Sequence, residues 1–257
     1  MRVSSVSVAG SGESNEDIAA TAGDVVVVLD GVSKWYTAES GCRHGTVWYV
    51  RQLAERILNH AAGDVPLSDA VAGAIADVAD AHRDTCDLTH PWTPSATVAV
   101  LRESAECVDY LIIADCVLVV ETKHGVVAHT DTRLAELLRR LREPDAPEEF
   151  RQHLKEGLRG LRNNPDGYWV ASVDPEAARQ AVTGSIAREA VHRAALLSDG
   201  ASCLVDNYSQ ATWEELLAMG PAALVDAVRA CEKSDPDRAR WPRGKVHDDA
   251  TAAYCEF

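Results

Sequence analysis

The sequence predicts an α+β fold in which antiparallel β-sheets carry helices on their outer faces. Strand-like and helical segments come in separate blocks: two strands, then two helices, then a run of closely spaced strands. This order differs from the βαβ repeat of parallel sheets and favours hairpin pairing between neighbours. With 257 residues, 46% of them apolar, the chain can bury a sizeable core, and we expect a single domain over residues 1–257.

The first half of the chain contains two kinds of predicted strand. Valine and serine alternate over residues 3–8, whereas residues 25–29 are continuously apolar, as in a strand buried on both faces. Two helices are expected next, because apolar residues recur at helical spacing over residues 47–61 and again after Ser68, which can cap the second helix. Further strands are expected at residues 97–101, 108–113, 117–121 and 126–128.

A basic segment interrupts the strands at about residues 133–164. Its leucines recur at helical spacing and are surrounded by arginines. The segment is either a pair of amphipathic helices with solvated basic faces or a flap that supplies cations to a phosphate group. Regular structure is then expected as a strand at residues 194–197, a helix from Pro221 and a strand at residues 251–257, with a loop at residues 234–245.

The composition argues against several classes of partner. A formal net charge of −15 and a pI of about 5.0 disfavour nucleic acids and anionic membranes, which bind basic surfaces. None of the seven cysteines forms a Cys-x-x-Cys pair, so we expect reduced thiols and a reducing compartment. No apolar run approaches the length of a membrane span, and no leader-like segment opens the chain. We therefore expect a cytoplasmic protein.

Four short acidic segments carry the functional signal. They are Ser14-Asn15-Glu16-Asp17, Val28-Leu29-Asp30-Gly31, Leu197-Ser198-Asp199-Gly200 and His247-Asp248-Asp249-Ala250-Thr251. Asp30 and Asp199 each end an apolar run and precede a glycine, which lets the backbone approach an ion closely. Carboxylates gathered at strand ends form a hard oxygen site that suits Mg²⁺ or Mn²⁺. The alternative is that these segments are turns and helix caps.

In this order the segments resemble the motifs of the metal-dependent PPM phosphatases, also called the PP2C family. The matching segments are Asn15-Glu16-Asp17, Asp30-Gly31, Ser95-Ala96-Thr97, Ala114-Asp115-Cys116, Asp199-Gly200 and Asp248-Asp249-Ala250-Thr251. The resemblance covers nearly the whole chain. It implies a four-layer αββα sandwich, in which two antiparallel sheets are flanked by helices, and a variable flap at about residues 133–164.

The resemblance also implies a centre of two Mg²⁺ or Mn²⁺ ions. In it, Asp30 would bridge the two ions and the carbonyl of Gly31 would bind one of them. Asp199 and Asp248 would complete the ligands of one ion, and Glu16 would bind the other. Two such ions can lower the pKa of a water enough to give a hydroxide near neutral pH, which would attack phosphorus in line.

Two further carboxylates have expected roles at this centre. Asp17 would lie just outside the direct ligands or act through water, and Asp115 would match the residue that can hold a third ion. Asp30, Asp199 and Asp248 are the residues that we expect catalysis to require.

Three departures from the family pattern affect phosphate recognition. Gly12 stands where the family usually has an arginine that clamps the substrate phosphate. The first Asp-Gly is usually followed by a Gly-rich turn, but here it is followed by Val32-Ser33-Lys34-Trp35, and Val32 stands where animal members often have a histidine proposed as general acid. The usual Gly-Asp-Ser-Arg segment has become Ala114-Asp115-Cys116-Val117. Candidate replacement cations are Lys34, His44 and the segment arginines Arg139, Arg140, Arg142, Arg159 and Arg162.

Two functions are therefore expected from the sequence. The first is hydrolysis of phosphate monoesters, on phosphoserine or phosphothreonine in proteins or on a small phosphorylated metabolite. The alternative is a catalytically weak relative that regulates or binds a phosphorylated partner. The retained carboxylates favour the enzyme.

Overall fold

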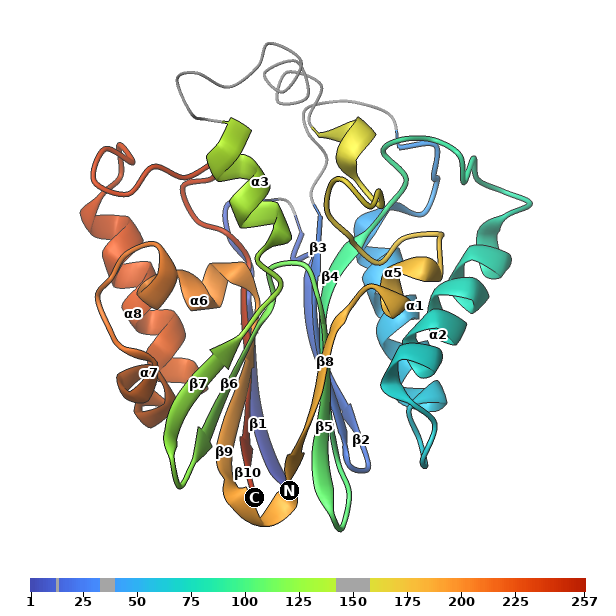
Figure 1. The fold of residues 1–257 in the computed structure, drawn as a ribbon. Helices are drawn as coiled ribbons and strands as arrows, with labels where there is room; N and C mark the ends of the chain where they lie inside the picture. The colour runs from blue at the N-terminus through green and yellow to red at the C-terminus, as the bar shows by residue number, and fades with distance from the viewer. Residues whose placement is uncertain (13, 33–39, 142–157) are drawn as a thin grey trace.

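Two five-stranded antiparallel sheets form the centre of the fold (Figure 1). The computed structural model describes residues 1–12, 14–32, 40–141 and 158–257. One sheet has the order β1 (Arg2–Val8), β10 (Ala250–Glu256), β9 (Val191–Leu197), β6 (Val117–Thr122) and β7 (Gly125–His129). The other has the order β2 (Asp17–Ala22), β3 (Val25–Gly31), β4 (Ala96–Glu103), β5 (Cys107–Ile113) and β8 (Val182–Ala187).

Helices cover the outer face of each sheet (Figure 1). The β2–β8 sheet carries α1 (Gly45–His60), α2 (Leu67–His82) and the short α5 (Glu176–Arg179). The β1–β7 sheet carries α6 (Asp199–Asp206), α7 (Trp213–Met219) and α8 (Pro221–Ser234). This arrangement confirms the predicted αββα sandwich of two antiparallel sheets. None of the helices in the described ranges is both long and apolar enough to cross a membrane.

Strand β3 is continuously apolar because both of its faces are buried. Val25, Val27 and Leu29 pack against α1 and α2, whereas Val26 and Val28 face the layer between the two sheets. Because successive side chains of a strand point to opposite faces, both sets are buried only if each face is covered. A third apolar layer lies between the β1–β7 sheet and α6–α8.

Several sequence expectations need correction at element boundaries. Ser68 does not cap α2, because the helix begins one residue earlier and Pro66 occupies the capping position. Asp199 does not end a strand; it is the first residue of α6, after β9 has ended at Leu197. The small-residue strands β2 and β8 were not predicted.

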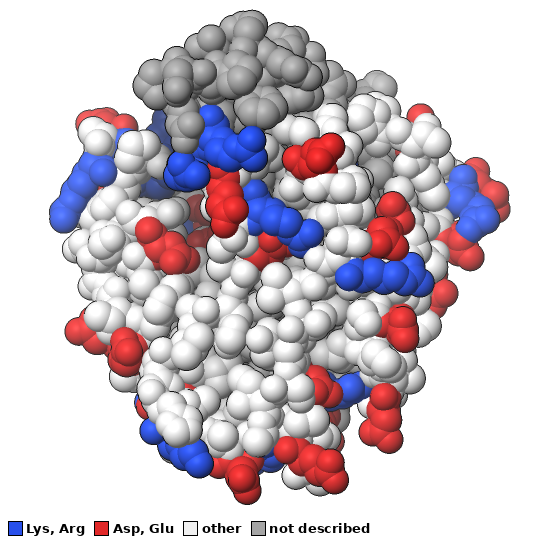
Figure 2. Space-filling model, viewed as in Figure 1, with Lys and Arg blue, Asp and Glu red and all other residues white. Residues whose placement is uncertain are grey.

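The basic segment is described only in part. Its first predicted helix is α3 (Arg133–Leu141), which lies at the end of the sandwich opposite the two chain termini (Figure 1). A short 3₁₀ turn, η1 (Arg159–Leu161), follows later. Residues 142–157, and with them Arg142, lie outside the described residues, as do Lys34 and the side chain of Arg159. On the face in Figure 2, basic side chains gather over α3, close to acidic ones.

Candidate metal centre

Carboxylates from both sheets meet at one end of the sandwich. Asp30, near the end of β3, lies opposite Asp17 of β2 in the strand register. From the other sheet, Asp199 opens α6 directly after β9, and Asp248 lies two residues before β10. Asp115 lies in the turn between β5 and β6. The segments that the sequence singled out are therefore brought to a common edge because β9 and β10 are neighbours, as are β2 and β3.

Asp30 and Asp199 form the centre of this cluster. Asp30 is half-buried, Asp199 faces the adjoining pocket, and each carboxyl group influences the pKa of the other. Burial, followed by the charges of Asp17 and Asp199, raises the pKa of Asp30 well above its usual range. Burial and the charge of Asp248 also raise the pKa of Asp199. A bound cation would offset the charge repulsion that contributes to these raised pKa values.

Two neighbouring carboxyls show the same effect. Burial is the main cause that raises the pKa of Asp17 to about 7, and the charges of Asp199 and Asp249 add to it. Burial also raises the pKa of Asp115 to about 7, with Asp199 as the largest charged contributor. Several carboxyls with raised pKa values at one place mark a candidate functional site.

The carboxylate of Asp17 has unmet hydrogen-bonding capacity. Neither of its oxygens has a partner in hydrogen-bond geometry, although both are buried. The hydroxyls of Ser198 and Thr251 lie close enough to lower its pKa, but they do not outweigh its burial. Since a buried carboxylate without full pairing is costly, Asp17 suits a site completed by water or a cation.

Glu16 is held at the site through its backbone. Its amide donates to a carboxylate oxygen of Asp249 at 2.8 Å, and the other oxygen of Asp249 accepts from the amide of Gly10 at 2.7 Å. The carbonyl of Glu16 accepts from the amide of Gly31 at 3.1 Å. A Cβ on Gly31 would lie 2.5 Å from Thr46 Cγ2 and 2.8 Å from the Glu16 carbonyl oxygen. Glycine is therefore required at position 31 by close packing.

Lys245 is a cation of the site that the sequence analysis missed. Its ammonium forms an ion pair with the carboxylate of Asp248 at 2.5 Å. Burial by itself would lower the pKa of Lys245, but the hydrogen bond to Asp248 and the charges of Asp248, Asp30 and Asp249 raise it overall. The signal in the sequence was a lysine three residues before Asp248.

The chemical type of these donors fits a hard divalent cation. Carboxylates and a backbone carbonyl are the ligands that Mg²⁺ and Mn²⁺ prefer. As the side chains stand in the part of the chain that the structure describes, no three His, Cys, Asp or Glu groups converge closely enough to hold an ion. The Asp248 carboxylate, for example, is already paired with Lys245. These side chains would therefore have to change rotamer before they could coordinate an ion.

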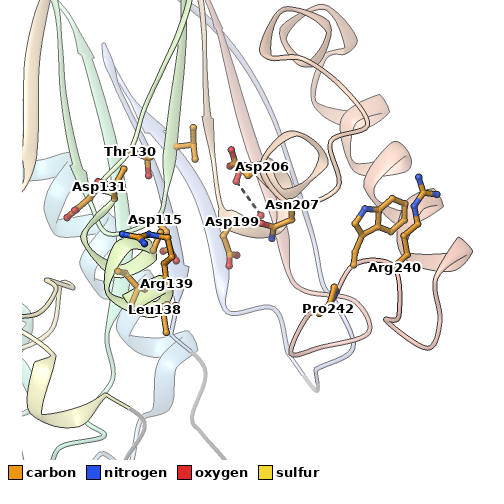
Figure 3. Close-up of a pocket in the computed structure, with 16 residues that line it drawn as sticks. Asp115, Thr130, Asp131, Leu138, Arg139, Asp199, Asp206, Asn207, Arg240 and Pro242 are labelled. Atoms are coloured by element: carbon orange, nitrogen blue, oxygen red, sulfur yellow. Dashed lines mark hydrogen bonds between the residues drawn. The ribbon is translucent and has the colours of Figure 1, made fainter. Parts of the chain in front are cut away.

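A pocket of about 890 Å³ opens beside the carboxylates (Figure 3). Asp115 and Asp199 lie on its walls, and Arg139 of α3 also lines it. Figure 3 shows Asp115, Asp131 and Arg139 on one side and Asp199, Asp206 and Asn207 on the other. The pocket is large enough for a phosphorylated side chain or a small metabolite. Of the arginines that the sequence suggested as replacement cations, Arg139 lines this pocket.

Two other proposed replacement cations are held elsewhere. Arg162 donates to the carbonyl of Thr93 and the hydroxyl of Ser172, at 3.0 and 2.7 Å, and so supports a loop. The ring of His44 stacks on Trp48, and its Nε2 lies 3.3 Å from the hydroxyl of Thr85. The expectation that either residue replaces the missing phosphate clamp is not supported by these contacts.

Comparison with solved structures identifies the fold. The chain is similar to the Mycobacterium tuberculosis serine/threonine phosphatase PstP/Ppp, with 16% identity, a TM-score of 0.59, and coverage of 100% of this chain and 98% of that one. The chain has the fold of the PPM phosphatases. The PstP catalytic domain in complex with two manganese ions gives 18% identity and a TM-score of 0.57, with 99% and 97% coverage. Stp1 from Staphylococcus aureus gives 12% identity and a TM-score of 0.62, with 99% and 94% coverage. No protein-family model and no curated protein sequence matches the chain.

Proposed function

We propose that this chain is a divergent PPM-type phosphatase that hydrolyses phosphate monoesters with the help of Mg²⁺ or Mn²⁺. The observation that carries the proposal is the approach of Asp30, on β3, to Asp199, at the start of α6, in a fold shared with a phosphatase that was solved with two manganese ions.

The proposed ligands are the residues expected from the sequence. Asp30, Asp199, Asp248 and Glu16, together with the carbonyl of Gly31, would hold the ions. When bound, such ions would supply a water of lowered pKa and positive charge for the phosphoryl oxygens. Asp17 would accept hydrogen bonds from ordered water, since its buried oxygens lack protein partners. Asp115 borders the pocket and would be available for a third ion.

Arg139 is the residue that we propose for phosphate binding. It lines the same pocket as Asp115 and Asp199. A guanidinium group donates two parallel hydrogen bonds to a phosphate, which a glycine at position 12 cannot do. The substrate would be a phosphorylated protein or a small phosphorylated metabolite. The seven free thiols support a reducing location such as the cytoplasm.

The second candidate is a catalytically weak relative that binds a phosphorylated partner. The ion pair between Lys245 and Asp248 favours it, because a proposed metal ligand is already neutralised by a residue of the chain. Gly12, which cannot bind phosphate through a side chain, favours it as well.

Hydrolysis of para-nitrophenyl phosphate tests the two candidates. The enzyme should be inactive after EDTA treatment and should recover with Mn²⁺ or Mg²⁺, and fluoride should inhibit it. Asp199→Asn should abolish the metal-dependent rate. Asp226→Asn, on the exposed face of α8, is the matched control and should leave it unchanged. Divalent binding in calorimetry without turnover on any phosphoester would favour the binding protein.

A further inference from the structure

Two cysteines far apart in the sequence lie side by side on the outer face of the β2–β8 sheet. The sulfur of Cys42, just before α1, is 3.4 Å from the sulfur of Cys86, just after α2, and the two positions are separated by 44 residues. A disulfide has a sulfur–sulfur distance of about 2.05 Å, so an approach of about 1.4 Å would close the bond.

The backbone already holds the two segments together. The amide of Asp87, next to Cys86, donates to the carbonyl of Gly41, next to Cys42, at 2.9 Å. A Cβ on Gly41 would lie 2.5 Å from the Cβ of His90, so the two loops are in close contact there. The loops therefore need little rearrangement to bring the sulfurs into bonding distance.

The two thiols differ in exposure and acidity. Cys42 is buried, and burial raises the pKa of its thiol. Cys86 is partly exposed; its slight burial would raise its pKa, but the amides of Arg43 and His44, the thiol of Cys42 and the hydroxyl of Thr85 lower it overall. Low pKa and exposure together make a thiol reactive towards oxidants, and a second thiol nearby can then resolve the product.

We propose that Cys42 and Cys86 form a reversible disulfide in response to hydrogen peroxide. The thiolate of Cys86 attacks one peroxide oxygen, the O–O bond breaks, and the sulfur becomes a sulfenic acid. The hydroxide that leaves takes up the proton lost from the thiol and becomes water. The sulfur of Cys42 then attacks the sulfenic sulfur, and the new S–S bond forms as its S–H proton and the sulfenic hydroxyl leave as a second water. Two thiols lose two electrons, and the peroxide gains them.

The bond would tie the start of α1 to the loop that leads into β4. Thr46, in the first turn of α1, packs against Gly31 next to Asp30. The dithiol is thus connected to the carboxylate cluster through one helical turn. The disulfide itself does not depend on the proposed phosphatase function, and each can fail without the other.

Peptide mapping of the whole chain tests the proposal directly. The reduced protein is treated with hydrogen peroxide, free thiols are alkylated in acid, and the chain is cleaved after Lys and Arg. Cys42 falls in the peptide of residues 35–43 and Cys86 in that of residues 84–102, each with one cysteine. We expect these peptides to be recovered linked, with a loss of about 2 Da relative to their summed masses, and to separate on addition of dithiothreitol. Recovery of the two peptides only as separate alkylated or over-oxidised species would overturn the proposal, as would random pairing among all seven cysteines.

Single variants assign the order of attack. Cys42→Ser should leave a sulfenic acid on Cys86 that a dimedone-type reagent traps, whereas Cys86→Ser should lose peroxide reactivity at this site. Cys231→Ser, which removes another partly exposed thiol on α8, should still form the link. Oxidation of the wild type should raise Tm by about 5 °C, because the bond closes a long loop, and the same treatment of Cys42→Ser should not. An equal rise in both proteins would contradict the proposal.

Discussion

The carboxyl groups of Asp30 and Asp199, from segments far apart in the sequence, lie close enough for each to influence the pKa of the other. Asp30 comes from β3, and Asp199 comes from the start of α6. Asp30 also lies in the field of Asp17 and Asp115, and Asp199 in the field of Asp248.

Asp17→Asn should stabilise the chain in EDTA at high pH. The pKa of Asp17 is about 7 in the folded chain and about 4 when unfolded. The folded state therefore binds more protons in this window, so the contribution of Asp17 is favourable below about pH 4 and is lost as the pH rises through about 7. At pH 8 the variant should exceed the wild type by roughly 1–3 kcal/mol in urea unfolding, and the gap should close towards pH 4. A gap independent of pH would show that charge on Asp17 is not the cause.

Lys245→Met should tighten Mn²⁺ binding. The ammonium of Lys245 pairs with Asp248, so an ion that uses this carboxylate must displace it. Loss of a partly exposed ion pair of about 1 kcal/mol corresponds to roughly fivefold tighter binding in calorimetry. Lys245→Arg should stay close to wild type, and Lys233→Met, at the end of α8, controls for a general change of charge. Weaker binding by Lys245→Met would mean that the lysine assists the site instead of competing for it.

Arg139→Ala should impair recognition of phosphorylated substrates. The side chain lines the pocket that contains Asp115 and Asp199. Removal of one charge-assisted contact should lower kcat/KM by roughly tenfold or more, mainly through KM, with Mn²⁺ affinity unchanged. Arg179→Ala, on α5, where Arg179 pairs with Glu176, is the control for loss of an exposed guanidinium. Equal rates for the Arg139 variant and the wild type would remove Arg139 from the proposed site.

Gly12→Arg should raise phosphatase activity. A Cβ on Gly12 would have its nearest neighbour at 3.5 Å, the carbonyl oxygen of Ser14, which is ordinary contact, so the position accepts a side chain. An added guanidinium can donate two hydrogen bonds to phosphate and should increase kcat/KM by about tenfold. Gly12→Gln adds bulk without charge and should have little effect. If the arginine variant binds Mn²⁺ but gains no activity, the proposed use of the carboxylates for hydrolysis would be in serious doubt.

Ala114→Gly should stabilise the turn that presents Asp115. Ala114 has a φ angle of 62°, which lies in the left-handed region where a Cβ is strained. Relief of that strain exceeds the entropy cost of glycine in the unfolded chain, so the free energy of unfolding should rise by roughly 0.5–1 kcal/mol. Thermal unfolding measures this change in stability. A lower Tm for Ala114→Gly would show that packing of the alanine methyl group stabilises the fold by more than the backbone strain destabilises it.

The sequence by itself predicted antiparallel sheets covered by helices, and it singled out the carboxylates that we propose for the metal site. The continuous apolar run of β3 required cover on both faces, and the structure supplies it with helices on one side and the second sheet on the other. The acidic segments could be recognised because their carboxylates adjoin short apolar runs or precede a glycine. The edge strands β2 and β8 could not be predicted, because their small and polar residues show little hydrophobic periodicity.

Tertiary structure alone decided how these residues act on one another. Whether Lys245 pairs with Asp248, whether Asp249 holds the amides of Gly10 and Glu16, and whether two thiols meet depend on distances between separate segments. Local sequence sets the φ and ψ preferences of a few residues, whereas these contacts arise when packed sheets and helices bring distant segments together. Burial then shifts pKa values because it removes water from charged groups, and the extent of burial is a property of the whole fold.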